Sequence, residues 1–386
     1  MIKRDLYSKV LEYQQIFPVV AILGPRQCGK STLAKMLISG DSSFVYLDLE
    51  RYSDLNKIND PELFFRNNQD KNICIDEVQL KPNLFNSLRS VIDEDRKNGK
   101  FLILGSASRE LIQQSSETLA GRIGYIELTP FNTKELENNL NFDLYRHWLR
   151  GGFPDSYLQH SNNASVIWRE NFIRTFVERD VPQLGINIPS LTTRRLLSMC
   201  AHNQGQLLNS SKLGESLGTS YHTVKNYLDL LEQLFIVRSL KPYLTNINKR
   251  IIKSPKVFIR DSGILHSLMN IEKMNDLLGH PVFGSSWEGY CIENIVTQFY
   301  DWQSYFYRTS SGNEIDLILE KGSKKLAIEF KASTAPKLTK GIYQALDDLG
   351  IEKIWVIAPT DDSYALNERI YISTLSNFLQ QTNKYS

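Results

Sequence analysis

The chain has 386 residues, 41% of them hydrophobic, which is enough for ordinary globular cores and suggests about two or three domains. The net charge of +2 excludes a polycation, so any nucleic-acid surface must be a local patch. The four cysteines (Cys28, Cys74, Cys200 and Cys291) form no CxxC pair, which argues against a zinc site or a disulfide framework. No apolar run approaches ~20 residues and the amino terminus lacks a signal-peptide core, so we expect a soluble cytoplasmic protein without a membrane segment.

Residues 17–130 alternate short β-rich runs with helical patterns, as a parallel sheet with crossover helices requires. The expected strands are "VVAILG", "FVYLDLE", "KNICIDE", "KFLILGS" and "IGYIELTP". The chain therefore begins with an α/β module, which we assign to residues 1–130. A mostly helical segment over residues 131–190 follows it.

The segment "GPRQCGKS" matches the phosphate-binding pattern G-x-x-x-x-G-K-[ST] and lies between the first expected strand and a helical run. Glycines let such a loop wrap closely around phosphates, and its N–H groups and the helix amino end supply positive potential. Lys30 is expected to reach the β- and γ-phosphates of ATP, and Ser31 to coordinate Mg²⁺. The expected nucleotide-binding residues are Gly24, Pro25, Arg26, Gln27, Cys28, Gly29, Lys30, Ser31, Thr32 and Asp76.

Two further strand ends carry candidate catalytic groups. Asp76 ends the strand "NICID" and is expected to bind Mg²⁺ through water, while Glu77 beside it is placed to polarise the attacking water. Ser106 ends "LILGS" and has two interpretations, which one serine can combine. It orients the water or senses the γ-phosphate, or it caps the helix "RELIQQ".

Arg122, in "LAGRIGYIEL", stands between a helical run and the last strand of the module. One interpretation is an arginine finger that reaches the γ-phosphate of a neighbouring subunit in trans. The other is an ordinary surface arginine.

The runs "GPRQCGKST", "ICIDEVQ", "LFNSLRSVIDE", "LILGS" and "LAGR" resemble bacterial and archaeal ATP-binding proteins of the AAA+ class. In that family the ATPase module precedes a poorly characterised carboxyl-terminal domain with a nuclease-like fold. "RGGFPD", "FVERDV" and "VFIRDSGIL" resemble its later motifs, so the resemblance covers nearly the whole chain. It implies an AAA+ P-loop ATPase core, a helical lid over residues 131–190 and a homo-oligomer, either a ring or a dimer. Arg150 and Arg179 are candidates for a sensor arginine in the lid.

Residues 191–265 predict a winged helix-turn-helix. Leu213 and Leu217 give one short helix an apolar face, "LGTS" makes the turn, and the next helix has an apolar stripe of Val224, Leu228, Leu231 and Leu234. His222, Lys225 and Asn226 are expected on the exposed side, suited to phosphates or base edges.

The hairpin expected after these helices is basic. Its cations are Arg238, Lys241, Lys249, Arg250, Lys253, Lys256 and Arg260. Such a local basic wing on a neutral protein indicates contact with a DNA backbone, for which Lys249, Arg250 and Lys253 are the main candidates. A protein partner is the alternative, because no base-reading arginine is evident on the recognition helix.

The last block, residues 266–386, contains "NEIDLILEKGSKKLAIEFKAS". If "KGSK" is the loop of an antiparallel hairpin, Glu320 pairs with Lys325, and Asp316 lies opposite Glu329 on the face that also carries Lys331. Two carboxylates on one face need a cation, for which Mg²⁺ is suited, and Lys331 beside them is placed to activate a water.

This D…E-x-K spacing resembles the PD-(D/E)XK nuclease superfamily, which implies a restriction-endonuclease-like α/β domain. The preceding helix "SSWEGYCIENIVTQFY" offers Glu288, and less directly Glu293, as a further acidic metal ligand, and Gln344 matches a glutamine often found in such nucleases. No proline precedes Asp316, a departure that the superfamily tolerates. An ion-pair ladder without metal is the alternative for this hairpin.

Two functions follow. The first is an ATPase that binds and hydrolyses ATP with Mg²⁺ and acts on DNA, with Mg²⁺-dependent cleavage at Asp316, Glu329 and Lys331. The alternative is a regulatory ATPase switch that binds protein partners and keeps an inactive nuclease-like scaffold.

Overall fold

The structure, a computed structural model, describes residues 2–39, 43–106, 115–138, 142–183, 188–244 and 251–382. Its internal contacts divide the chain into two compact units. The first comprises residues 1–131 and 233–235, and the second comprises residues 132–232 and 236–386. Within the described ranges no helix is both long and apolar enough to cross a bilayer.

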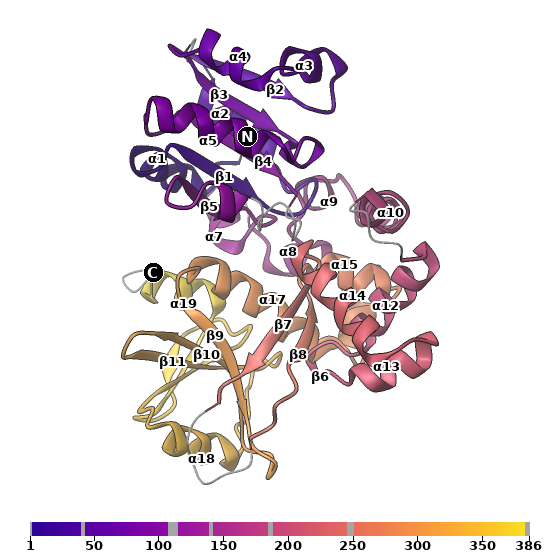
Figure 1. Ribbon diagram of the computed structural model, residues 1–386. Helices are drawn as coiled ribbons and strands as arrows, with labels where there is room; N and C mark the ends of the chain where they lie inside the picture. Colours follow the sequence, from indigo (N-terminus) through magenta and orange to yellow (C-terminus); the bar gives the residue numbers. More distant parts are fainter. Residues whose placement is uncertain are drawn as a thin grey trace. The chain divides into compact units, whose positions relative to one another are not determined.

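The first unit is built on a five-stranded parallel sheet in the order β2-β3-β4-β1-β5 (Figure 1). The strands are β1 (Val19–Leu23), β2 (Phe44–Asp48), β3 (Asn72–Asp76), β4 (Phe101–Gly105) and β5 (Ile123–Glu127). Each lies in one of the five predicted runs, so the predicted α/β module with a parallel sheet is confirmed.

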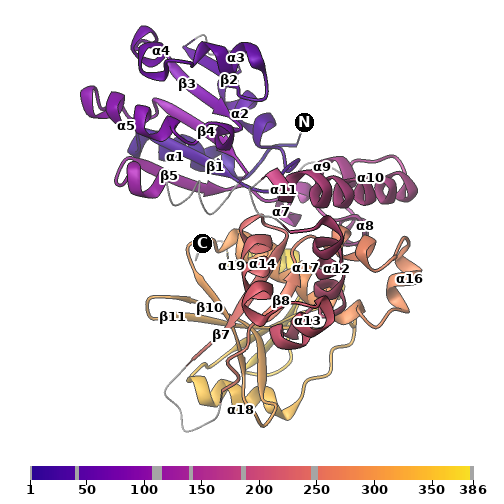
Figure 2. The ribbon, with the colours of Figure 1, turned by 45° about the vertical axis from the view of Figure 1, so that its right-hand side comes forward.

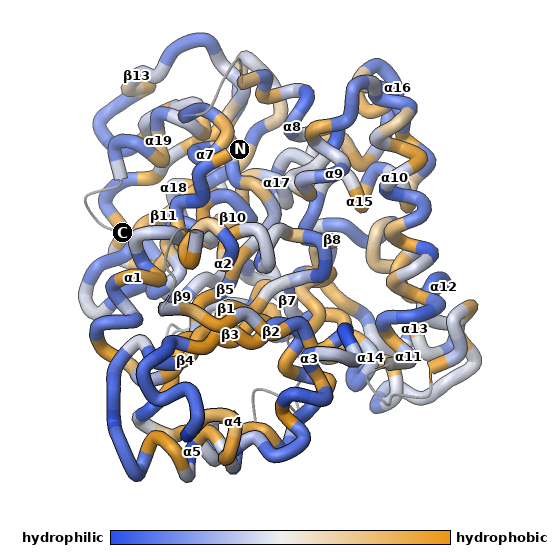
Figure 3. Tube along the Cα trace, turned by 90° about the horizontal axis from the view of Figure 1, so that it is seen from above, coloured by the Kyte–Doolittle hydropathy of each residue, from blue (hydrophilic) through white to orange (hydrophobic). Residues whose placement is uncertain are grey.

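Helices cover both faces of this sheet, which explains why its strands are apolar at successive positions. Val19, Ala21 and Leu23 pack with α5 (Leu84–Glu94), and Val20 and Ile22 pack on the other face with α1 (Leu6–Ile16) and α2 (Lys30–Ile38). Figure 3 draws β1 and β3 in the hydrophobic colour. The shorter elements of the unit are α3 (Tyr52–Lys57), α4 (Pro61–Asn67) and the 3-10 turn η1 (Val78–Leu80).

The second unit begins with helices, as the sequence predicts (Figure 2). They are α7 (Thr133–Glu137), α8 (Leu144–Arg150), α9 (Pro154–Tyr157), α10 (Asn162–Thr175), the π-helical turn η2 (Phe176–Asp180) and α11 (Val181–Gln183).

Three helices and a small antiparallel sheet follow. They are α12 (Ser190–His202), β6 (Gln206–Leu207), α13 (Ser210–Leu217), α14 (Tyr221–Gln233), β7 (Val237–Pro242) and β8 (Lys256–Ile259). The two helices expected around "LGTS" are present, and Gly218 ends α13 with φ +67°. Leu213, Val224 and Leu228 are buried, as their spacing predicts.

The carboxyl-terminal block extends the small sheet, because β7 pairs in parallel with β9. The result is a nine-stranded sheet in the order β13-β14-β12-β11-β10-β9-β7-β8-β6. The predicted regions 191–265 and 266–386 therefore share one sheet inside one compact unit. The added elements are α15 (Ser262–Leu268), α16 (Met274–Leu278), α17 (Phe283–Gln298), β9 (Gln303–Arg308), β10 (Glu314–Lys321), β11 (Lys324–Phe330), α18 (Lys340–Leu349), β12 (Ile354–Ile357), β13 (Tyr364–Ala365), β14 (Ile370–Ser373) and α19 (Leu375–Thr382).

The predicted hairpin around "KGSK" is confirmed. β10 and β11 are antiparallel, and Glu320 pairs with Lys325. The turn between Lys321 and Lys324 uses Gly322 at φ +60°, a conformation that glycine adopts without steric cost.

Candidate active site

The loop between β1 and α2 has the geometry that phosphate binding requires. A side chain on Gly24 would place its Cβ 2.1 Å from the Leu128 carbonyl oxygen, so only glycine fits there. Gly29 has φ +100° directly before α2. The buried Lys30 ammonium donates hydrogen bonds to the carbonyl oxygens of Gly24 (3.0 Å) and Pro25 (2.8 Å). The loop therefore holds a cation at the amino end of a helix, where an anion is favoured.

A buried arginine supports this loop from the amino terminus of the chain. Arg4 donates from Nη1 to the Cys28 carbonyl oxygen (2.8 Å) and from Nη2 to the Thr129 carbonyl oxygen (2.5 Å), and its guanidinium lies over the Phe131 ring. Cys28 itself is fully buried, and burial raises the pKa of its thiol. The sequence analysis missed Arg4, because nothing in "MIKRD" marks a residue whose partners lie 24 and 125 positions away.

The other loop residues lie nearer the surface. Arg26 pairs with Glu50, whose carboxylate oxygen lies 3.6 Å from the guanidinium, and Thr32 is exposed on α2. Gln27 has φ +61°, which the tight loop imposes on a residue other than glycine.

Three oxygen-bearing side chains gather beside the loop. The Tyr46 hydroxyl, on β2, donates to Asp76 Oδ2 at 2.5 Å and also hydrogen-bonds Ser31. Burial, followed by the neighbouring Asp76 carboxylate, raises the pKa of Tyr46 well above its ordinary value. Hard oxygen ligands of this kind suit Mg²⁺, so Ser31 and Asp76 fit the predicted ion. Tyr46 is a further residue that the sequence analysis missed. Its signal was a polar aromatic in the strand that pairs with "NICID".

Glu77 and Ser106 lie together through Gln79. The Gln79 amide donates to Glu77 Oε2, and its nitrogen lies 3.4 Å from Ser106 Oγ. Burial raises the pKa of Glu77, while the Gln79 hydrogen bond lowers it. The segment "RELIQQ", residues 109–114, whose predicted helix Ser106 would cap, lies outside the described residues.

Arg122 stands at the opposite edge of the sheet from the phosphate loop. Its carbonyl oxygen accepts the Val19 N–H at the start of β1, whereas the loop follows the end of β1. Five strand residues at about 3.3 Å each separate these edges by roughly 16 Å. The Arg122 side chain pairs with Asp93, at 2.7 Å from Nε and 2.6 Å from Nη2. It therefore does not reach the nucleotide site of its own chain.

The carboxylates predicted as a metal site in the second unit do lie near one another, but they already have partners. Lys331 Nζ lies 2.6 Å from Glu329 Oε1, and the Phe330 N–H donates to Asp316 Oδ2 at 3.0 Å. Glu329 Oε2 is buried and accepts no hydrogen bond from the residues that the structure describes. Burial, followed by the neighbouring Asp316, raises the pKa of Glu329 well above its ordinary value, although Lys331 lowers it.

A buried lysine fills the space between the other acids. Lys256, on β8, places its ammonium 2.8 Å from Glu314 Oε1, 2.9 Å from Glu288 Oε1 and 3.4 Å from Asp316 Oδ1. Burial lowers the pKa of Lys256, but the three carboxylates raise it to a net value well above the ordinary one, so the ammonium stays charged. The prediction that Lys256 belongs to an exposed basic wing is wrong, because its side chain is 4% exposed.

The arrangement does not fit a resident Mg²⁺. The Glu288 and Asp316 oxygens that would bind it contact an ammonium, and Glu329 Oε1 contacts Lys331. Across the described ranges, no group of three or more His, Cys, Asp or Glu residues has a geometry suited to a metal ion.

Other predicted residues of this region have structural partners. Glu293 accepts hydrogen bonds from both Arg238 and Arg260. Although burial raises the pKa of Glu293, the two arginines hold it below its ordinary value. Glu293 is thus not a spare metal ligand, and the two arginines are not free to contact a DNA backbone. Gln344 is exposed on α18 and donates to Asp348.

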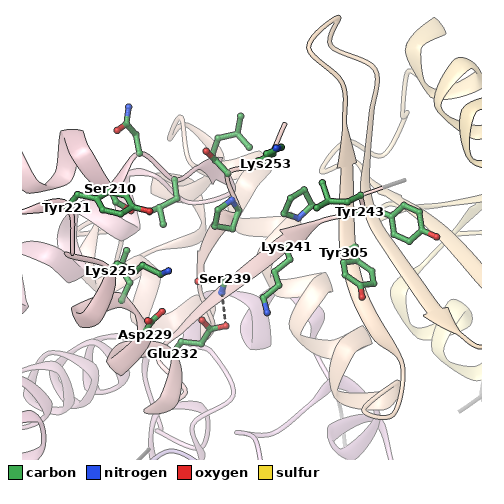
Figure 4. Close-up of a pocket in the computed structure, with 18 of the residues that line it drawn as sticks. Ser210, Tyr221, Lys225, Asp229, Glu232, Ser239, Lys241, Tyr243, Lys253 and Tyr305 are labelled. Carbon is green, nitrogen blue, oxygen red and sulfur yellow. Dashed lines mark hydrogen bonds between the residues drawn. The ribbon is translucent and has the colours of Figure 1, made fainter. Parts of the chain in front are cut away.

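A groove of about 1190 Å³ runs between α14 and the strands β7 and β9 (Figure 4). Its lining includes the lysines Lys225, Lys241 and Lys253 and the tyrosines Tyr221, Tyr243 and Tyr305. His222, Lys225 and Asn226 are exposed on α14, as predicted, and Lys253 is exposed before β8. The predicted DNA-binding residues Lys249 and Arg250 lie outside the described residues.

The two candidate lid arginines lie in the second unit. Arg150 is buried, and its guanidinium donates to Asn162 Oδ1 (2.8 Å) and to the Gln159 carbonyl oxygen (2.5 Å). Arg179 lies in the π-helical turn η2.

Comparison with known proteins agrees with this geometry. An AAA domain model matches residues 17–137, and two models of domains of unknown function (DUF8612 and DUF4143) match residues 141–275 and 283–378. A Walker-type ATPase of Pyrococcus abyssi has a similar fold, with a TM-score of 0.51 at 15% identity over 70% of this chain and 96% of that one. The loop, the strand order and the AAA match identify residues 17–137 as an AAA-type P-loop domain.

Relatives of nearly full length also exist. An uncharacterized protein of Mycobacterium tuberculosis is 36% identical over 368 residues, which are 95% of this chain and 82% of that protein, and a Mycobacterium bovis protein matches equally. The chain belongs to the family of these two mycobacterial proteins. An uncharacterized protein of Methanocaldococcus jannaschii is 21% identical over 92% of this chain.

Proposed function

We propose that the chain hydrolyses ATP at the P-loop and that DNA bound by its second unit controls this hydrolysis. Lys30 exchanges its bonds to the Gly24 and Pro25 carbonyls for bonds to the β- and γ-phosphates. Ser31 and Asp76 hold Mg²⁺, which supplies neutralisation of phosphate charge when bound. Glu77 polarises the attacking water, and Gln79 and Ser106 orient it.

The active form in this proposal is a homo-oligomer. Arg122 faces away from the nucleotide site of its own chain and pairs with Asp93. It can therefore contact the γ-phosphate of ATP bound to a neighbouring subunit.

The groove beside α14 carries the DNA part of the proposal. Its three lysines form no ion pair with any residue in the described ranges, so they are available to phosphates. Of the three acids in the lining, two are already engaged: Glu320 accepts from the Tyr243 hydroxyl (2.8 Å), and Glu232 accepts from the Ser239 N–H (3.3 Å). The third, Asp229, is exposed on α14. Tyrosine faces among lysines suit bases as well as backbone. The order α12-β6-α13-α14-β7-β8 supports a winged-helix interpretation of residues 191–265.

No cleavage step is part of this proposal. The antiparallel β9-β10-β11 and the parallel β11-β12 pairing support a nuclease-like fold for residues 266–386. The carboxylates of this region are paired with lysines, which favours a structural role for the nuclease-like fold.

A protein partner is the second candidate. The observation that favours it is the internal pairing of Lys256, Arg238 and Arg260, which removes three cations from the predicted basic wing.

The test is ATP hydrolysis measured with and without duplex and single-stranded DNA at low salt. We expect stimulation in the wild type, loss of stimulation in the double variant Lys225→Glu/Lys253→Glu, and unchanged hydrolysis without DNA. Lys353→Glu makes the same type of charge change at an exposed site that does not line the groove, and should keep the stimulation. If DNA neither binds nor changes hydrolysis, the protein-partner function replaces the DNA function.

A further inference from the structure

The buried ammonium of Lys256 has a complete set of hydrogen-bond acceptors. A lysine ammonium has three N–H donors, and three carboxylates lie within 3.4 Å of Lys256 Nζ: Glu288, Glu314 and Asp316. These acids come from α17 and β10, whereas the lysine comes from β8. A cation supplied by one strand thus joins a helix and a second strand.

The Lys256 ammonium occupies the position that a divalent cation bound by these three carboxylates would take. Oxygen ligands approach Mg²⁺ to about 2.1 Å, so a metal held by all three carboxylates would lie where the ammonium lies, and two cations cannot occupy that position. The carboxylate oxygens here stand 2.8 to 3.4 Å from a nitrogen at their centre. The Lys256 side chain is 4% exposed, so it does not withdraw into solvent without an opening of the surrounding structure.

We propose that Lys256 is a built-in substitute for a divalent cation, so that the acidic cluster of the second unit takes no Mg²⁺ or Mn²⁺ in the wild-type protein. The ammonium holds the three carboxylates together and fills the space between them. Removal of the Lys256 ammonium then creates a divalent-cation site from Glu288, Glu314 and Asp316. This inference concerns the second unit and does not depend on the DNA proposal.

The experiment is a Mn²⁺ titration of the nucleotide-free full-length protein, followed by electron paramagnetic resonance of free Mn²⁺. The P-loop is the same in all variants, so differences between them report the second unit. We expect Lys256→Met to bind one Mn²⁺ more than the wild type, and the double variant Lys256→Met/Asp316→Asn to lose it. Mn²⁺ should raise the thermal midpoint of Lys256→Met and leave that of the wild type unchanged. Lys324→Met, which removes an exposed lysine from the turn of the same sheet, should behave as the wild type.

Two results would overturn the proposal. One is a Mn²⁺ site in the wild type that disappears in Asp316→Asn or Glu329→Gln. The other is a folded Lys256→Met, by circular dichroism, that gains no site. If Lys256→Met does not fold, the comparison of wild type with Asp316→Asn decides: no difference in bound Mn²⁺ supports the proposal, and a loss of bound Mn²⁺ refutes it.

Discussion

Replacement of Arg4 by alanine should destabilise the first unit and weaken ATP binding, although Arg4 lies 20 residues before the P-loop begins. The guanidinium donates to two backbone carbonyls, those of Cys28 in the loop and Thr129 after β5. Hydrogen bonds from charged donors contribute about 1.5–3 kcal/mol each. Arg4 is 5% exposed, so water does not replace these bonds without rearrangement. We therefore expect a loss of about 3 kcal/mol or more in the free energy of unfolding of this unit.

The assay is thermal unfolding with and without ATP, combined with a direct measurement of ATP affinity. A loss of that size lowers the midpoint by about 9–15 °C for a unit of this size. We expect at least about a tenfold weaker ATP affinity, because the Cys28 carbonyl loses the donor that positions the loop. Arg4→Lys should recover part of both effects, since an ammonium keeps the charge but not the two-pronged geometry. Lys3→Ala removes an exposed neighbouring cation and serves as the control. If Arg4→Ala matches Lys3→Ala in midpoint and affinity, the guanidinium does not support the loop.

Two further predictions concern hydrolysis. Burial raises the pKa of Glu77 and the Gln79 hydrogen bond lowers it, and only the deprotonated carboxylate polarises water. The acidic limb of the kcat profile should therefore lie above the ordinary glutamate range and move to still higher pH in Gln79→Ala. An unchanged or lowered limb would show that this bond does not act on the catalytic group. Arg122→Ala should lower kcat about 10³-fold or more while ATP binding is kept. Mixing Arg122→Ala chains with Glu77→Gln chains should restore hydrolysis, because the first supply an intact Glu77 and the second an intact Arg122. Asp93→Ala, which frees the arginine, should remain active, and loss of ATP binding in Arg122→Ala would refute the role in trans.

The features of the first unit that the sequence predicted well depend on segments that follow one another closely along the chain. A run such as "VVAIL" followed by "GPRQCGKS" places a buried strand, a tight loop and a helix start within 15 residues, and each constrains the next. The positions of Glu77 and Ser106 followed from the same logic, since parallel strands end at one edge of a sheet. Arg4 and Tyr46 were not predictable in this way, because their partners are set by how distant segments close over the sheet.

Lys256 shows a different limit of prediction from the sequence, and the pattern of the residues around it can partly overcome this limit. Counting cations between Val237 and Asp261 predicted a basic wing, but a charge count does not state which side chains point inward. In β8 the three residues that follow Lys256, namely Val257, Phe258 and Ile259, are all apolar, and the whole strand is buried. A lysine at the head of such a strand cannot leave its charge in an apolar core, so it requires carboxylates from elsewhere. Glu314 and Asp316, two apart on β10, present carboxylates on one face of that strand and meet this requirement. Asp316 therefore belongs both to the D…E-x-K spacing that predicted a metal site and to the pair of carboxylates that binds the buried lysine, and the position of β8 in the fold decides between the two.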